Sequence, residues 1–189
     1  MDKKTLVGEK QLERVGEIHN KVFEANKEYL NYWLHNTFLH WDFWLSFVFT
    51  VAPWVVFIIV RKKTSTHRLL YVGLFAIFLS SWFDFLGVMY GLWYYTGKVF
   101  PSMPSYMPWD FSILPVFIML LIQFKPNMKA HWKGVFFATV GTCIGEPFFK
   151  WLGFYVTLKW NGWYSFAIYF FIYVSCHRLS RVSNFDLIE

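Results

Sequence analysis

The feature that most constrains this chain is a series of five apolar blocks, each close to the length of a helix that crosses a bilayer. A spanning helix needs about 20 predominantly apolar residues, and the blocks cover residues 41–60, 68–95, 108–124, 134–156 and 160–177. Charged residues make up only 16% of the 189 residues, compared with about 25% in typical soluble domains. A soluble domain of this length has too little interior for so much apolar surface. We therefore predict an all-α integral membrane bundle of five transmembrane helices in residues 41–189.

Prolines and aromatic residues within the blocks are compatible with this prediction. Pro53, Pro115 and Pro147 lie inside blocks, and membrane helices tolerate such kinks because neighbouring groups satisfy the freed backbone. Tryptophan and tyrosine crowd the block ends, as side chains that prefer the interface between lipid and water do. These residues are Trp41, Trp44, Trp93, Tyr94, Tyr95, Trp109, Trp132, Trp160 and Trp163.

Residues 1–40 form a separate segment, in which six basic and six acidic residues leave no net charge. Its apolar residues recur at helical spacing, at Leu12, Val15, Ile18, Val22, Ala25 and Tyr29. We predict an amphipathic N-terminal helix that lies on the membrane surface or contacts a protein partner through residues 1–34. The alternative is a solvated tail that becomes helical only on contact. No apolar core precedes residue 41, so a signal peptide is not expected.

Basic residues are distributed unequally between the blocks. The second and fourth connections carry only Lys98 and Lys159. The first and third connections and the C-terminal tail together carry nine, which are Arg61, Lys62, Lys63, Arg68, Lys125, Lys129, Lys133, Arg178 and Arg181. The positive-inside rule then predicts a multi-pass protein of the cell membrane with its C-terminus in the cytoplasm and its N-terminus outside. Because the net charge of +6 is spread over loops rather than over one face, we predict no nucleic-acid partner.

Three acidic residues, Asp84, Asp110 and Glu146, stand within or at the edge of the apolar blocks. An acid at the centre of a spanning helix costs about 2.5–3.5 kcal/mol. At a rise of about 1.5 Å per residue, each lies about 20–24 Å from the basic end of its own helix. The three therefore share one layer in the outer half of the bilayer. We predict a shared polar pocket in which Asp84 faces Glu146.

Nearby residues complete the predicted pocket. Lys150 follows Glu146 by four residues, so that both lie on one helix face in the favourable order for an ion pair. Trp93 and Tyr94 belong to the aromatic residues that surround the acids. Purely structural explanations compete with this one, because Asp110 can cap the start of the third helix. Asp84 and Glu146 can likewise form a buried polar tie between helices.

Motifs of soluble enzymes and of metal sites are absent from the sequence. His35 and His40 are five residues apart, which is the wrong spacing for two ligands on one helical face. Cys143 and Cys176 lie in apolar stretches and form no CxxC pair. There is no glycine-rich phosphate loop, GxSxG or HExxH. We predict neither a metal nor a cofactor.

A set of short motifs between residues 40 and 177 resembles an uncharacterised family of small multi-pass membrane proteins from Bacillus- and Clostridium-type Firmicutes. The motifs are Asp84-Phe85-Leu86-Gly87, Gly91-Leu92-Trp93-Tyr94, Pro104, Pro108-Trp109-Asp110, Leu114-Pro115-Val116, Met119-Leu120, Glu146-Pro147, Trp151-Leu152-Gly153-Phe154-Tyr155 and Tyr164-Ser165. The resemblance implies the same membrane topology and no particular activity. Residues 1–40 lie outside the pattern.

The intramembrane Asp84, the stretch Gly91-Leu92-Trp93-Tyr94 and the later proline-led acid are also similar to small bacterial lycopene cyclase subunits. Those cyclases carry two adjacent acids after the proline, whereas this chain has only Asp110 after Pro108-Trp109. The similarity implies an acid that protonates a polyene, with aromatic faces that stabilise the resulting carbocation.

Four functions follow as hypotheses. The first is binding, without catalysis, of a small or lipidic ligand in the acid- and aromatic-lined pocket. The second is an isoprenoid-modifying enzyme of the cyclase kind. The third is a proton-coupled transporter, since chains of intramembrane acids serve as relays. The fourth is assembly with a partner protein through the N-terminal segment.

Overall fold

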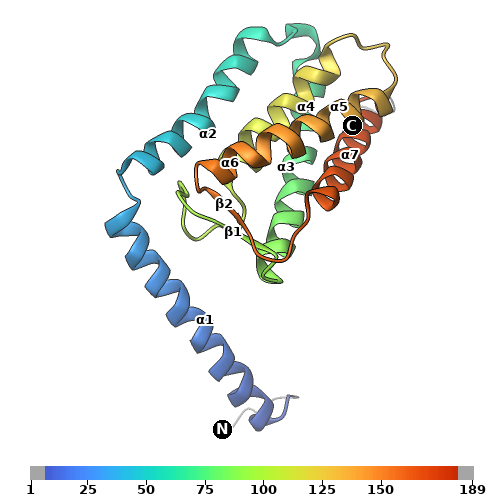
Figure 1. The fold of residues 1–189 in the computed structure, drawn as a ribbon. Coiled ribbons are helices and arrows are strands. Elements are labelled where there is room, and N and C mark those ends of the chain that lie inside the picture. Colours follow the sequence, from blue (N-terminus) through green and yellow to red (C-terminus); the bar gives the residue numbers. More distant parts are fainter. Residues whose placement is uncertain (1–6, 183–189) are drawn as a thin grey trace, which may run out of the picture.

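The computed structural model describes residues 7–182, and 75% of the chain is helical, as predicted for an all-α protein (Figure 1). The helices are α1 (Glu9–Asn36), α2 (Trp41–Val60), α3 (Thr66–Met89), α4 (Leu114–Gln123), α5 (Ala130–Val140), α6 (Glu146–Trp151) and α7 (Gly162–Leu179). A 3₁₀ turn (Lys63–Ser65) precedes α3, and π-helical turns precede α4 (Trp109–Ile113) and α6 (Gly141–Gly145). A small sheet that the sequence did not predict pairs β1 (Trp93–Tyr95) with β2 (Tyr155–Thr157).

Two helices of the described chain, not five, are long and apolar enough to cross a membrane by themselves. They are Trp41–Val60 and Lys63–Met89. The third predicted span is a shorter apolar helix, Trp109–Gln123. The fourth is divided by its π-helical turn, and the fifth, α7, mixes its apolar residues with tyrosine, tryptophan and serine. The prediction of five uniform spanning helices is therefore confirmed only in part.

The two long apolar helices carry most of their apolar side chains on the outside of the molecule. Their most apolar stretches are only 17% and 33% buried, and Ile59 and Leu74 are 76% and 67% exposed. A core helix of a soluble protein would hide these side chains, because their contact with water is unfavourable by about 25 cal/mol per Å². The exposure favours an apolar surrounding and indicates membrane association.

The interior of the bundle lies between α3, α4, α5 and α7. α5 packs along α7, and α3 contacts both α4 and α7. Val72 and Ala76 of α3 are fully buried with Ile118 and Met119 of α4. These side chains form the main apolar core, and they fix α3 and α4 in register beside the predicted acid layer.

Both π-helical turns end two residues before a proline, Pro115 or Pro147. Proline has no N–H, so the carbonyl four residues earlier loses its usual helical partner. For Pro115 that carbonyl belongs to Phe111, and the Trp54 indole of α2 donates to it at 2.9 Å. A π-helical turn adds one residue to the helical circumference. The sequence thus places a widened turn next to Asp110 and another next to Glu146.

β1 and β2 lie at the ends of two apolar blocks that were predicted to be helical throughout. The block 68–95 stops being helical at Met89, and the block 134–156 stops at Trp151. Gly91 (φ +63°) and Gly153 (φ +77°) adopt left-handed conformations that end both helices. The antiparallel pairing places Tyr95 opposite Tyr155.

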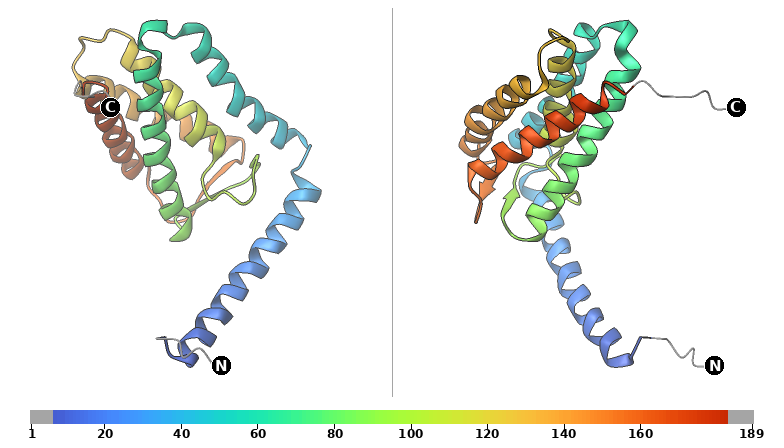
Figure 2. Two further views of the ribbon diagram at one scale, coloured as in Figure 1. Left: turned by 180° about the vertical axis from the view of Figure 1, so that it is seen from behind. Right: turned by 90° about the vertical axis from the view of Figure 1, so that its right-hand side faces the viewer.

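α1 is the predicted amphipathic helix. In all three views it projects away from the other helices (Figures 1 and 2). Its first five turns are exposed, and only its last turns are attached to the bundle. Trp33 is buried against Phe43 and Val99, and its indole Nε1 donates to the Lys98 carbonyl at 2.7 Å. The Lys98 ammonium lies 6.0 Å from the Tyr29 ring centre. Residues 1–6 of the predicted segment lie outside the described residues.

Trp33→Ala is expected to release α1 from the bundle, because the substitution removes the buried ring and the hydrogen bond to the Lys98 carbonyl. Loss of a buried tryptophan costs about 3 kcal/mol. Chymotrypsin should therefore cleave the turn at Phe38 and Leu39 at least about tenfold faster. Tyr32→Ala is the control, since Tyr32 is exposed on the same helix. Equal cleavage of the two variants would contradict the attachment through Trp33.

Candidate functional site

Three buried acids from three elements meet at the end of the bundle that the sheet covers. Asp84 comes from the last turns of α3, Asp110 from the π-helical turn before α4, and Glu146 from the first residue of α6. Their contacts place the three acids in two neighbouring groups. Asp84 and Asp110 belong to one hydrogen-bonded group, and Glu146 lines a cavity next to it.

Asp84 and Asp110 share a single donor. The Tyr106 backbone N–H donates to Oδ2 of Asp84 at 3.2 Å and to Oδ2 of Asp110 at 3.1 Å. The Tyr95 hydroxyl donates to Oδ1 of Asp84 at 2.8 Å. Two carboxyl groups this close repel each other when both are ionised, so a proton shared between them stabilises the pair. The predicted neighbour of Asp84 was Glu146, whereas the acid that shares its donor is Asp110.

A stack of tyrosine rings holds these donors in place. The rings of Tyr95 and Tyr106 are 5.0 Å apart and nearly parallel, and the rings of Tyr95 and Tyr155 are 5.4 Å apart. Ser46 Oγ lies 2.8 Å from the Tyr106 hydroxyl. Burial raises the pKa of Tyr95, and the neighbouring Asp84 raises the same pKa further. Burial also raises the pKa of Tyr155, with Glu146 as the second cause. Both phenols therefore stay protonated, and that of Tyr95 donates to Asp84.

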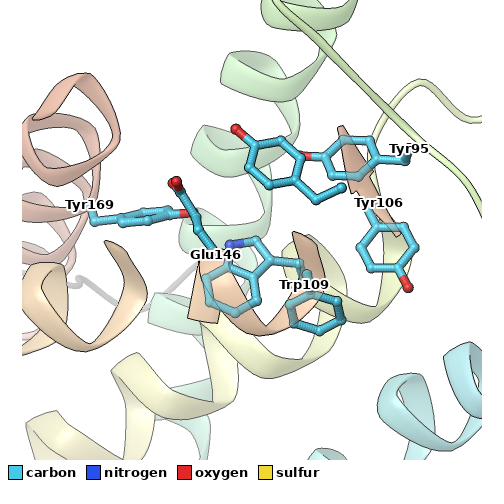
Figure 3. Close-up of a pocket in the computed structure, with 7 residues that line it drawn as sticks. Tyr95, Tyr106, Trp109, Glu146 and Tyr169 are labelled. Atoms are coloured by element: carbon cyan, nitrogen blue, oxygen red, sulfur yellow. The ribbon is translucent and has the colours of Figure 1, made fainter. Parts of the chain in front are cut away.

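A cavity opens between this stack and Glu146, and Figure 3 shows the Glu146 side chain between the rings of Tyr169 and Trp109. Its free volume of about 20 Å³ admits about one water molecule. The hydroxyls of Ser165 and Tyr169 approach the Glu146 carboxyl. The indole Nε1 of Trp109 is buried and has no hydrogen-bond partner in residues 7–182. The cavity is lined by Tyr95, Tyr106, Trp109, Glu146, Phe149, Tyr155 and Tyr169.

An apolar groove of about 210 Å³ adjoins this cavity. The groove and the cavity share two lining residues, Trp109 and Phe149. The groove runs between α4 and α5, and it is walled only by apolar side chains and glycines. Its other lining residues are Ile113, Leu114, Phe117, Phe137, Val140, Gly141, Ile144, Gly145 and Phe148.

Of the six predicted pocket residues, Glu146 alone lines the cavity. Asp84 and Asp110 form the neighbouring hydrogen-bonded group, and the other three lie elsewhere. Lys150 is exposed, with its ammonium 5.4 Å from the Tyr155 ring centre. The only ion pair in the described part of the chain is Arg14–Glu17, so the predicted pair of Lys150 with Glu146 is not formed. Tyr94 is 44% exposed, because strand alternation turns it away from the interior.

Trp93 is buried on the same strand face as Tyr95, but it packs elsewhere. Its ring lies 4.6 Å from that of Trp160, and it is not among the residues that line the cavity.

Sequence reasoning missed the tyrosines that connect the acids. A signal was present in α7, where Ser165, Tyr169 and Tyr173 follow one another at four-residue intervals and place hydroxyl groups on one helical face. Buried hydroxyls need partners as buried acids do, so this stripe pointed to the interior of the bundle. Tyr106 carries no such pattern, because it lies in the irregular segment before Trp109.

The described part of the chain contains no cluster of side chains that could bind a metal ion. Within residues 7–182 no three His, Cys, Asp or Glu side chains lie close enough to hold an ion. Cys143 and Cys176 are both free thiols, the first exposed and the second buried. What the site offers is carboxyl groups, phenolic hydroxyls and one unpaired indole N–H, which together recognise a ligand through hydrogen bonds. Comparisons with family models, with curated proteins and with solved structures returned no match, so the family resemblance of the sequence motifs stays a prediction.

Proposed function

We propose that this chain is a multi-pass membrane protein that binds a lipidic ligand bearing a hydroxyl group. The hydroxyl occupies the cavity beside Glu146, and the apolar tail occupies the groove between α4 and α5. The observation that carries the proposal is the junction of the two spaces at Trp109 and Phe149, one space with polar groups and the other entirely apolar.

The membrane part of the proposal places all of α2 to α7 in the bilayer. Large apolar side chains are exposed on α5, on the π-helical turn before α6, on α6 and on α7, as well as on the two long helices. Among them are Trp132, Phe136, Ile144, Trp151, Trp163 and Phe171. Helices interrupted by prolines are tolerated in membranes where the irregular backbone is buried in protein, and Asp110 and Gly141 in the two π-helical turns are buried. The basic loops then lie in the cytoplasm with the C-terminus, and α1 lies outside.

The proposed topology predicts opposite labelling of two loops. In a Cys143→Ser background, Thr64→Cys should react with an impermeant maleimide only after the cells are permeabilised, whereas Ser102→Cys should react in intact cells. Both positions are exposed, so accessibility to the reagent is set by the membrane alone. Reaction at position 64 and none at position 102 in intact cells would overturn the orientation.

The choice of a hydroxyl follows from two of the polar residues that line the cavity, Glu146 and Trp109. The Glu146 carboxyl accepts a hydrogen bond, and the unpaired Trp109 indole N–H donates one. A hydroxyl both donates and accepts, so one such group satisfies both at once. An ammonium group would satisfy the carboxyl and leave the indole unpaired, at a cost of about 1–3 kcal/mol.

Binding of farnesol and of farnesyl methyl ether to the purified protein in a neutral detergent tests this proposal. Farnesol should raise the Tm, and the ether should bind at least about tenfold more weakly, because it cannot donate to Glu146. Glu146→Gln should weaken farnesol binding by about tenfold through loss of the charged acceptor. Lys150→Gln is the matched control one turn away, outside the cavity.

The groove has its own pair of variants. Ile144→Trp should block the apolar tail, whereas Ile59→Trp, at an exposed position on α2 outside the groove, should leave binding unchanged. Equal binding of the alcohol and the ether by the unmodified protein would contradict the role of the hydroxyl.

A second candidate, acid-catalysed cyclisation of an isoprenoid, is favoured by the Asp84–Asp110 pair. The resemblance to lycopene cyclase subunits already includes Asp84, and the second of the adjacent acids is still missing after Asp110; the structure adds that Asp84 and Asp110 share one donor. A proton from the pair would add to a terminal double bond, the carbocation would close the ring, and a proton would return to the carboxylate. Expression in a lycopene-accumulating bacterium tests this candidate. Cyclised pigment supports it, and unchanged lycopene beside inserted protein excludes it for this substrate.

The projecting α1 supports a contact with a protein partner in addition. Leu12, Val15, Ile18 and Val22 form an exposed apolar stripe, and α1 points away from the bundle (Figure 2). A stripe held away from the bilayer is better covered by another helix than by lipid.

A further inference from the structure

A second cavity lies at the opposite end of the bundle from the acids, among the basic loops. It has a volume of about 210 Å³ and lies between the start of α3, the end of α4 and the end of α7. Its polar lining residues are Lys62, Ser65, Arg68, Gln123, His177 and Arg181, together with Ser180. None of these residues belongs to the site proposed above.

The charge at this end of the molecule has one sign. Lys62, Arg68 and Arg181 line the cavity. The sequence has no Asp or Glu in residues 43–83, in residues 111–145 or in residues 147–185, which include all of the cavity walls. The three cations are solvent-exposed and face one space without an acid among its walls, so they repel one another and a bound anion would relieve that repulsion.

Hydrogen bonds hold the walls of this cavity in place. The Gln123 side chain accepts from the Lys62 backbone N–H at 2.6 Å and donates to the Val60 carbonyl at 3.1 Å. Arg181 donates to the Pro126 carbonyl. These bonds join the connection before α3, the end of α4 and the end of α7, so the cations sit on a fixed frame.

Several donors in the cavity are left for a ligand. Among the described residues no side chain caps the N-terminus of α3 at Ser65, where the helix dipole is positive. Arg68 makes only a long contact of 3.4 Å with the Ser180 carbonyl. His177 is only 7% exposed, and its Nδ1 is buried without a hydrogen-bond partner in residues 7–182. A buried polar atom without a partner is costly, and a bound acceptor at this position removes that cost.

We propose that this cavity binds the phosphate group of an anionic lipid. Phosphate suits a helix N-terminus flanked by guanidinium groups, because it accepts several charge-assisted hydrogen bonds at once. A lipid is the favoured source because a groove with one apolar wall adjoins the cavity between the ends of α2 and α4. The groove shares Lys62, Gln123 and Pro126 with the cavity. Val60, Leu120 and Phe124 form its apolar wall, and Lys125 adds a further cation. Free phosphate shares the same chemistry and is separated from lipid by the experiment.

The test compares two double variants of the whole protein by native mass spectrometry and thermal unfolding. Arg68→Gln/Arg181→Gln removes two cavity cations. Lys63→Gln/Arg178→Gln removes two exposed cations at the same end that do not line the cavity. Phosphatidylglycerol should bind the unmodified protein at least about tenfold more tightly than phosphatidylcholine. The cavity variant should lose about tenfold of that affinity and the control less than about twofold.

The second part of the test uses inorganic phosphate as the ligand. The single variant Arg68→Gln is measured as well, in case the double variant does not fold. Stabilisation by phosphatidylglycerol but not by millimolar phosphate supports a lipid site. Stabilisation by both, lost in the cavity variant, supports the site and assigns it to soluble phosphate as well. Equal losses in the cavity and control variants would overturn the proposal, because general surface charge would then explain the binding. Absence of any preference for phosphatidylglycerol, with no effect of phosphate, would overturn it too.

Discussion

Asp84→Leu is expected to lower the free energy of unfolding by about 3 kcal/mol. Within residues 7–182, the leucine removes the only acceptor of the Tyr95 hydroxyl and one of two acceptors of the Tyr106 N–H. It also removes the carboxyl that shares the Tyr106 N–H with the buried Asp110. A buried donor without an acceptor costs about 1–3 kcal/mol, and the loss of a second acceptor at Tyr106 adds to that cost. Unfolding in detergent, followed by near-ultraviolet circular dichroism, measures the loss.

Asp84→Asn is the matched control for this prediction. The amide keeps an acceptor for Tyr95 and adds donors toward Asp110, so the loss should stay within about 1 kcal/mol. Tyr95→Phe removes the donor and should cost about as much as a single hydrogen bond, about 1 kcal/mol. If Asp84→Leu proves as stable as Asp84→Asn, the acid pair does not hold α3 to the segment before α4.

Gly87→Val is expected to cost about 3 kcal/mol through overpacking. A Cβ at Gly87 would lie 2.0 Å from Cζ2 and 2.1 Å from Cη2 of the Trp93 ring. That ring is buried and packs against Trp160 and Tyr155, so it has no free space to enter. Its displacement should separate β1 from β2. The Tm should fall, and tryptophan fluorescence should shift as Trp93 becomes exposed.

Gly16→Ala on α1 is the control, since a Cβ there meets nothing within 4 Å. Alanine in a helix interior is favoured over glycine by about 1 kcal/mol, so this variant should be neutral or slightly stabilising. Gly87→Ala provides an intermediate step with a smaller side chain. A Gly87→Val protein with an unchanged Tm would show that the contact with Trp93 is not tight.

Parts of the fold are predictable from the sequence because apolar length and periodicity are local signals. The block 41–60 coincides with α2, and the periodic segment before it is the helix α1. Where the helices of the other blocks end is not determined by such local signals. Trp93 and Tyr155 lie in apolar stretches that read as helix, and they form a sheet because two distant segments pair with each other.

The acid layer was predictable from depth alone, but the pairing within it was not. The number of residues between an acid and the basic end of its helix gives the height of that acid above the basic loops. By this count Asp84, Asp110 and Glu146 lie at one level. Which side of the helix an acid faces depends on rotation, and the π-helical turn before Pro115 changes that rotation for Asp110. The carbonyl that the turn frees is satisfied by Trp54, a contact across two helices that no single segment reveals.

The π-helical turns make the site sensitive to the number of residues as well as to their identity. A regular helix advances by about 100° for each residue, and a π-helical turn is a helix with one residue inserted. With α4 held by its packing on α3, deletion of the codon for Phe111 or Ser112 would restore the regular helix. Everything before it would then rotate by about 100°, carrying Asp110 away from Asp84 and Trp109 away from Gly145. In this architecture a single-codon insertion or deletion can therefore gain or lose an acid pair while every side chain that forms it is retained.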